Sequence, residues 1–179
     1  MTPGTRPGMR SATKSITAPP GYVFRAMTAA DLPLVGTWLE QPHVREWWGD
    51  PNEQYILIRD DLDHPAMDQF IVAIDDRPFA YLQCYDPTAW PLNSFGMQPE
   101  GTRGIDQFIG EADMIGRGHG SALIRNFIER LVKSGTPRVV TDPDPANARA
   151  VRAYEKAGFA KARLIDAPDR RALLMVFDA

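Results

Sequence analysis

The chain has 179 residues, 44% of them hydrophobic and 24% charged, which fits one ordinary globular domain and excludes a fibrous or largely disordered protein. Its net charge of −3, from 20 lysines and arginines against 23 aspartates and glutamates, argues against a basic nucleic-acid-binding surface, so we expect no nucleic-acid partner. No apolar run approaches the roughly 20 residues that cross a bilayer. We therefore expect a cytoplasmic protein with no membrane contact.

Metal-binding and disulfide patterns are missing from the sequence. Cys84 is the only cysteine, which excludes an internal disulfide and a thiolate cluster. His43, His64 and His119 are scattered and do not form an HExxH-like motif. We therefore expect no metal ion.

Residues 1–20 differ in composition from the rest of the chain. They contain four prolines, the cations Arg6, Arg10 and Lys14, no acid and no apolar periodicity, so we interpret them as a flexible basic N-terminal tail. Removing these three positive charges from the net −3 leaves −6 on residues 21–179, which we expect to form a single domain. A mildly acidic domain suits a cationic or amine substrate better than an anionic one.

From Tyr22 the residue pattern alternates between strands and helices. In chain order, it first predicts a strand at 22–27, a helix through Leu34 and Leu39 that starts with a capping box between Thr28 and Asp31, and a helix over 53–62. A β-hairpin follows, with strands at 69–74 and 79–85 around a turn at 75–78, and then a loop over 86–101, whose length inside a compact domain is typical of a functional segment. The remaining elements are a strand at 104–110, a helix through Leu123 and Leu131, a strand at 137–142, a helix that starts at Asp144-Pro145 and ends at Gly158, and two closing strands.

Glycine occupies every second position of the turn between the strand at 104–110 and the next helix, in the sequence Ile115-Gly116-Arg117-Gly118-His119-Gly120-Ser121. Glycines let a ligand approach the backbone closely, and free N–H groups at a helix start bind anions. Arg117 would add a positive charge beside a pyrophosphate. The spacing matches neither the Rossmann fingerprint nor the P-loop, and taken alone the turn is explained equally well as an ordinary glycine-rich loop.

A second motif begins 27 residues after Gly120, where residues 147–159 read NARAVRAYEKAGF, with the layout NxxAxxxYEKxGF. Together the two motifs resemble the GCN5-related N-acetyltransferase superfamily. That family's cofactor motif, R/Q-x-x-G-x-G/A, falls on residues 115–120, and its later helix carries an Asn and a Tyr seven residues apart, here Asn147 and Tyr154. Ile115 departs from the usual Arg or Gln. The resemblance runs from about Tyr22 to Phe177.

The resemblance implies an α/β (α+β) fold, in which a mixed, mostly antiparallel sheet with flanking helices is splayed at the acetyl-CoA site between the strands at 104–110 and 137–142. Tyr154 would act as general acid toward the departing CoA thiolate, with an ordinary buried aromatic as the alternative. For Asn147 the alternative is a turn residue near the helix start. Acetyl-CoA would be the co-substrate, bound by Phe108, Ile109, Ile115, Gly116, Arg117, Gly118, His119, Gly120, Ser121, Asn147 and Tyr154.

Within this superfamily, three segments resemble the aminoglycoside 6′-N-acetyltransferases: PHVREWWG at 42–49, RGIDQ at 103–107 and TDPDPAN at 141–147. That resemblance implies that Asp106 is the acid beside the reacting amine and that Asp142 and Asp169 help to hold a polycationic substrate. Trp47 and Trp48 would form one wall of the pocket, with core packing as the alternative for one of them. Asp106 lies within an apolar strand, where an unpaired carboxylate is unfavourable, and this supports a functional role.

Other functions stay open. The loop over 86–102 holds only Asp86 and Glu100 as acids, fewer counter-charges than a multiply charged aminoglycoside would use. Siderophore-type N-acyltransferases of lysine or hydroxylysine also resemble the chain, although that group generally carries His in place of Asp106. A non-catalytic acyl-CoA-binding domain and a protein-tail acetyltransferase are further alternatives. We expect a small-molecule amine as the partner, and the sequence is compatible with a monomer or a homodimer.

Overall fold

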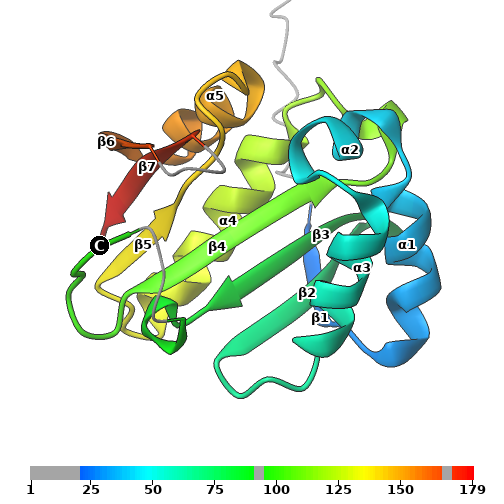
Figure 1. The fold of residues 1–179 in the computed structure, drawn as a ribbon, viewed down its shortest axis with the longest axis horizontal. Coiled ribbons are helices and arrows are strands. Elements are labelled where there is room, and N and C mark those ends of the chain that lie inside the picture. Colours follow the sequence, from blue (N-terminus) through cyan, green and yellow to red (C-terminus); the bar gives the residue numbers. More distant parts are fainter. Residues whose placement is uncertain (1–20, 91–94, 167–170) are drawn as a thin grey trace, which may run out of the picture.

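One mixed sheet of seven strands organises the fold, in the order β1-β2-β3-β4-β5-β7-β6 (Figure 1). The computed structural model describes residues 21–90, 95–166 and 171–179, so the predicted tail at 1–20 and Asp169 lie outside the described residues. The strands are β1 (Val23–Ala26), β2 (Met67–Ile74), β3 (Arg77–Tyr85), β4 (Arg103–Ile109), β5 (Arg138–Thr141), β6 (Ala160–Asp166) and β7 (Arg171–Asp178). The helices are α1 (Leu32–Leu39), α2 (Pro42–Trp48), α3 (Pro51–Asp60), α4 (His119–Lys133) and α5 (Ala148–Ala157), with short 3₁₀ turns η1 (Ala29–Asp31), η2 (Pro87–Ala89) and η3 (Ala112–Met114).

The sheet is antiparallel except at its centre. Strands β1 to β4 follow one another as antiparallel neighbours, and β5, β7 and β6 form a second antiparallel group. The two groups meet where β4 runs parallel to β5, and only Arg103 pairs with Val139 and Gly104 with Val140. Beyond these pairs the two strands separate, which Figure 1 shows as the divergence of the β4 and β5 arrows. The predicted mixed, mostly antiparallel sheet is confirmed, together with its opening between these two strands.

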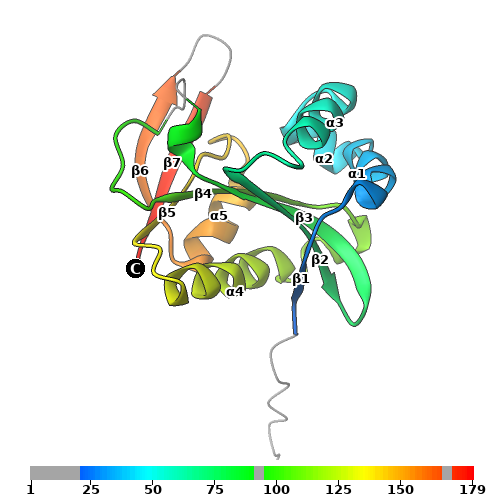
Figure 2. The ribbon, with the colours of Figure 1, turned by 90° about the horizontal axis from the view of Figure 1, so that it is seen from below.

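Helices cover both faces of the sheet, with α1, α2 and α3 on one face and α4 and α5 on the other (Figure 2). Beneath α4 and α5 lies a core to which α4 contributes a stripe at Leu123, Ile124, Phe127 and Ile128, the spacing of an amphipathic helix. A second core, centred on Trp38, lies beneath α1, α2 and α3. No helix among the described residues combines the length and apolar character needed to span a membrane.

Local sequence signals account for several of the observed boundaries. Asp75 and Asp76 both have positive φ, 49° and 61°, which makes the β2–β3 connection a two-residue turn, shorter than the predicted turn at 75–78. The Asp31 carboxylate accepts hydrogen bonds from the Thr28 backbone N–H and hydroxyl at 2.9 and 3.0 Å, so these two residues interact at the helix start as predicted. Gly158 ends α5 with a φ of 107°, which confirms the predicted glycine cap.

The predicted helices differ from the observed ones: α3 begins and ends two residues earlier than the predicted 53–62, α2 was not predicted, and the start of α5 was misplaced. The segment at 42–48 forms an additional helix, α2, because Pro42 occupies its first turn, where a proline does not interrupt helical hydrogen bonds. Helix α5 begins at Ala148 instead of at Asp144-Pro145. The Asp144 carboxylate accepts a hydrogen bond from the Ala146 N–H at 2.7 Å and forms a turn, while Asn147 caps the helix by accepting from the Ala150 N–H at 3.0 Å.

Gly110 follows β4 and lies against the Trp38 ring, where a Cβ atom would come within 2.1 Å of Trp38 Cγ. We expect Gly110→Ala to destabilise the fold by about 1–3 kcal/mol, because the methyl group would displace a fully packed indole. Urea unfolding measures the change. Gly21→Ala is the matched control, because a Cβ there has no neighbour within 4 Å, and an equal loss in both variants would contradict the packing argument.

Candidate active site

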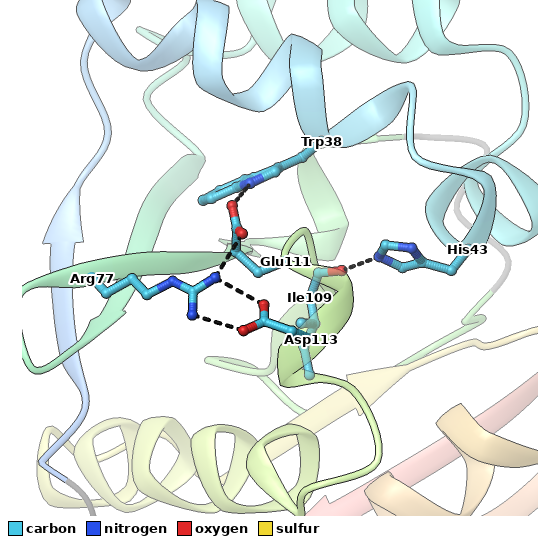
Figure 3. Close-up of polar contacts among 6 residues, drawn as sticks. All are labelled: Trp38, His43, Arg77, Ile109, Glu111 and Asp113. Atoms are coloured by element: carbon cyan, nitrogen blue, oxygen red, sulfur yellow. Dashed lines mark hydrogen bonds and ion pairs between the residues drawn. The ribbon is translucent and has the colours of Figure 1, made fainter.

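The separation of β4 from β5 leaves backbone groups of β4 without a strand partner. The Gly110 N–H donates to the Phe79 carbonyl of the β3 side at 2.8 Å, and strand alternation then directs the peptide groups of Gln107 and Ile109 toward the gap. The Ile109 carbonyl there accepts a hydrogen bond from His43 Nε2 at 2.9 Å (Figure 3). Helix α2 is therefore fastened to this edge of β4.

Two adjoining cavities lie along the gap. The smaller, of about 110 Å³, runs between the end of β4, the start of α4 and α5, and the predicted cofactor residues that line it are Phe108, Ile109, Ile115, Gly120 and Asn147. The larger, of about 400 Å³, contains Asp106, Asp142 and Tyr154. The residues that line both cavities are Trp47, Trp48, Gln107, Asn147 and Ala150. Because they share these residues, the two cavities form a ligand site of two parts with one common wall.

The glycine turn precedes α4 with its backbone in the left-handed region. Gly116 and Gly118 have φ values of 76° and 87°, and both residues and Arg117 are exposed. The free N–H groups at the start of this 15-residue helix therefore face a surface that a phosphate can approach. The Ser121 hydroxyl donates to the Gly118 carbonyl at 3.2 Å and stabilises the turn.

The side chain of His119, which was predicted to contact the cofactor, points into the protein. Its Nδ1 lies 2.8 Å from the Tyr22 hydroxyl, and its ring contacts the rings of Tyr22 and Phe79 at centroid distances of 6.0 and 5.5 Å. The imidazole thus anchors the glycine turn to the core.

A network of ion pairs fixes the corner between β4 and the glycine turn. The Arg77 guanidinium binds both oxygens of Asp113, at 2.9 and 2.8 Å, and one oxygen of Glu111 at 2.9 Å (Figure 3). The other Glu111 oxygen accepts a hydrogen bond from Trp38 Nε1 at 2.9 Å. Hydrogen bonding to Arg77 lowers the pKa of Asp113. The β2–β3 hairpin and helix α1 therefore hold the segment that leads into Ile115.

Acidic side chains and two tryptophans surround the larger cavity. Asp106 comes from β4, Asp142 and Asp144 follow β5, and Trp47 and Trp48 come from α2. The ring of Trp48 also packs edge-on against Phe108 at 4.9 Å, so it combines core packing with a position on the wall. Asp169, the remaining predicted substrate residue, lies outside the described residues.

Tyr154 lies on α5 with its ring in the core and borders the larger cavity. Its ring meets Phe159 edge-on at 5.3 Å, and the residue is 4% exposed. Burial, and secondarily the negative charge of Asp106, raise the pKa of Tyr154. The phenol is therefore neutral at physiological pH and can donate a hydrogen bond. Tyr154 therefore packs in the core and also borders the candidate site.

Asn147 joins the two cavities and caps α5. Because its Oδ1 accepts the Ala150 N–H, the amide nitrogen is the part of its side chain that can serve a ligand. Trp47 Nε1 and Gln107 Oε1, on the wall shared by both cavities, are buried and have no hydrogen-bond partner among the described residues. Buried polar atoms are normally paired, so these two atoms support a ligand that supplies the missing partners.

Several residues at the site were not predicted from the sequence, among them His43, Gln54, Gln83, Gln107 and Arg171. Single glutamines carry no motif, and only the β3–β4 register places Gln83 opposite Asp106. Arg171 brings a cation to the larger cavity, and its Nε donates to Asp166, which is not among the lining residues, at 2.9 Å. Within the described part of the chain, no group of His, Cys, Asp or Glu side chains is placed to hold a metal ion.

Comparisons with known proteins agree with this architecture. A family model for the acetyltransferase (GNAT) domain matches residues 27–167. The aminoglycoside N(6′)-acetyltransferase type 1 of Klebsiella pneumoniae is 34% identical over 164 residues, which cover 86% of this chain and 81% of that enzyme. The chain therefore belongs to the GNAT acetyltransferase family, as its two sequence motifs predict.

Two further relatives bear on the ligands. The solved structure of AAC(6′)-Ib with paromomycin and acetyl-CoA matches with a TM-score of 0.76 at 32% identity, covering 88% of this chain and 93% of that one. The N(6)-hydroxylysine O-acetyltransferase of Escherichia coli is 24% identical over 151 residues, which cover 79% of this chain and 46% of that enzyme.

The left-handed backbone at Gly118 gives a test of the proposed phosphate site. We expect Gly118→Ala to weaken CoA binding about tenfold, because an L-residue resists this conformation by about 1–2 kcal/mol and would shift the turn. Gly135→Ala is the matched control: Gly135 has a φ of 93°, lies just beyond the other end of α4 and likewise has open space at its Cβ. Calorimetric titration with CoA compares them, and equal weakening in both variants would assign the effect to stability.

Proposed function

We propose that this protein transfers the acetyl group of acetyl-CoA to a primary amine of a cationic small molecule, the 6′-amine of an aminoglycoside. The observation that carries the proposal is the acidic cavity containing Asp106 and Asp142, which shares a wall with the cavity along the free edge of β4. The relatives that act on or bind aminoglycosides support the same substrate class.

Acetyl-CoA would occupy the smaller cavity. Its pantetheine arm would extend the sheet along the gap-facing peptide groups of Gln107 and Ile109, and its pyrophosphate would lie on the exposed turn at 116–118. Asn147 would donate from its amide nitrogen to the arm. This arrangement would bring the thioester to the wall shared with the larger cavity, which Asp106 lines.

Asp106 would anchor the substrate ammonium and assist its deprotonation. An ordinary Asp with a pKa near ~3.9 is a weak base toward an ammonium near ~10.4, so full proton transfer before attack is unfavourable by roughly 9 kcal/mol. An ammonium has no free electron pair, so attack starts from the small fraction of neutral amine that forms when one proton passes to water. We therefore assign Asp106 to orient this amine and to accept the second proton, directly or through water, once attack on the thioester carbonyl has acidified the nitrogen. The nitrogen–carbon bond forms and the carbon–sulfur bond breaks in one ternary complex.

Tyr154 would stabilise the departing CoA thiolate. Its pKa lies above the ordinary ~10 of a phenol, whereas a thiol has a pKa near ~8.5, so complete protonation of the thiolate by Tyr154 is uphill. A hydrogen bond from the neutral phenol to the sulfur is the contribution that this acidity supports.

A second candidate substrate is a lysine-like amine that also carries a carboxylate. Arg171 lines the acidic cavity and offers a cation to such a group. The relative that acetylates hydroxylysine supports the same kind of substrate, at a lower identity of 24%. Asp106, where siderophore-type enzymes generally carry His, favours the aminoglycoside.

Domain organisation and assembly follow as proposals. Residues from α2 to β7 line one site, which supports a single catalytic domain over 21–179 with 1–20 as a basic extension. The net −6 of that domain favours a cationic small molecule over nucleic acid. The proposed reaction is compatible with a monomer and with a homodimer.

Release of CoA thiol in the presence of different amines tests the function. We expect rapid release with aminoglycosides bearing a 6′-amine, little with matched sugars bearing a 6′-hydroxyl, and loss of at least about 100-fold in Asp106→Asn, which cannot accept the ammonium proton. Lysine, N6-hydroxylysine and polyamines complete the panel, and CoA titration checks that the variant still binds cofactor. If CoA is released only with the lysine-like amines, the second candidate substrate would replace the aminoglycoside.

Tyr154→Phe separates a hydrogen bond from full acid catalysis. We expect kcat to fall about tenfold with CoA affinity nearly unchanged, because the hydroxyl acts on the sulfur only as charge develops. Steady-state kinetics with a 6′-amino sugar measure this, and an unchanged kcat would remove Tyr154 from the reaction.

A further inference from the structure

Gln83 connects the buried β3 strand with Asp106. It lies directly opposite Asp106 in the antiparallel β3–β4 register, and its Nε2 donates a hydrogen bond to Asp106 Oδ2 at 3.0 Å. A hydrogen bond to a charged acceptor is stronger than one between neutral groups. Gln83 also borders the larger cavity, so it holds the carboxylate at the cavity wall.

The orientation of the Gln83 amide is set by Tyr81, two residues earlier on the same strand. The Tyr81 hydroxyl donates to Gln83 Oε1 at 2.9 Å, which leaves the amide nitrogen toward Asp106. Tyr81 is fully buried, and its ring stacks on Phe108 at 5.3 Å and meets Trp48 edge-on at 6.0 Å. The donor is therefore packed on several sides, and it is not among the residues that line the larger cavity.

We propose that Gln83 is a positioning residue for acetyl transfer: Tyr81 fixes its amide, and the amide holds the Asp106 carboxylate in place and in its charged form. The inference rests on the proposed function of Asp106. Hydrogen bonds run in one direction, from the Tyr81 hydroxyl to Gln83 and from Gln83 to Asp106. Such a chain of donors stabilises negative charge at its end and restricts the carboxylate to one orientation.

Other groups surround the same carboxylate. The Tyr85 hydroxyl approaches Asp106 from β3. Tyr81, Cys84 and Tyr154 interact with its charge, and Asp142 and Tyr154 line the same cavity. Burial, followed by the charge of Asp106, raises the pKa of Tyr81, Tyr85 and Tyr154, so all three are neutral at physiological pH. Asp142 opposes a charged Asp106, and the amide of Gln83 acts against that repulsion.

The test compares Gln83→Met and Tyr81→Phe in kcat/KM across pH, each also in the Asp106→Asn background. We expect Gln83→Met to lower kcat about tenfold and Tyr81→Phe about three- to fivefold, the ranges of a charged and a neutral hydrogen bond. Without its donor the carboxylate is protonated more easily, so the acidic limb of the pH profile should move to higher pH in both variants. In the Asp106→Asn background both effects should largely disappear.

Gln69→Met is the matched control, because Gln69 lies opposite Gln83 on β2 but donates to the Ile58 carbonyl at 2.9 Å. It should lower stability in urea without moving the pH profile.

A Gln83→Met enzyme with wild-type kcat and pH profile would overturn the inference. A raised KM that persists unchanged in the Asp106→Asn background would overturn it too, because Gln83 would then contact substrate directly. Full activity of Asp106→Asn alone would instead overturn the proposed role of Asp106. If Gln83→Met fails to fold, the pH profile of Tyr81→Phe tests the inference instead.

Discussion

The short pairing between β4 and β5 is the constraint on which the rest of the site depends. Parallel strands paired along their whole length would satisfy each other's backbone groups and leave no edge for a ligand. Here the ladder stops after Gly104 and Val140, and the remaining residues of β4 face a gap. The smaller cavity, the peptide groups that point into the gap and the wall shared with the larger cavity all follow from this early separation.

Because side chains alternate along a strand, β4 contributes to three surfaces. Asp106 and Phe108 face the layer of α1, α2 and α3, Gln107 and Ile109 face α4 and α5, and the peptide groups of the second pair point into the gap. The Asp106 carboxylate and the peptide groups that face the gap are thereby held one residue apart on the same strand. Gly104, at the start of the strand, lies under the Tyr85 ring, where a Cβ would come within 2.4 Å of the ring, and this explains why glycine precedes Ile105 and Asp106.

Residues within contiguous motifs were predictable from the sequence, whereas residues joined by register were not. The glycine turn and the capping Gly158 were predicted correctly, since each depends on neighbours in the chain. The opening between β4 and β5 was predicted through the family resemblance, because the two strands lie far apart in the sequence. Gln83 and His43 escaped prediction because their partners, Asp106 and the Ile109 carbonyl, lie 23 and 66 residues away. The start of α5 was misplaced because Asp144 and Asn147 are both good caps, and the turn that Asp144 forms leaves the cap to Asn147.

The charge of the site bears on both ends of the proposed reaction. Asp106, Asp142 and Asp144 border one cavity of about 400 Å³, and the tyrosines around Asp106 contribute hydrogen-bond donors without adding charge. An ammonium entering this cavity relieves repulsion among the carboxylates and is attracted at short range. Acetylation converts that ammonium into a neutral amide, so the attraction at this position is lost in the step that forms the product. In the proposed reaction, the same carboxylates that would hold the substrate would therefore favour release of the product.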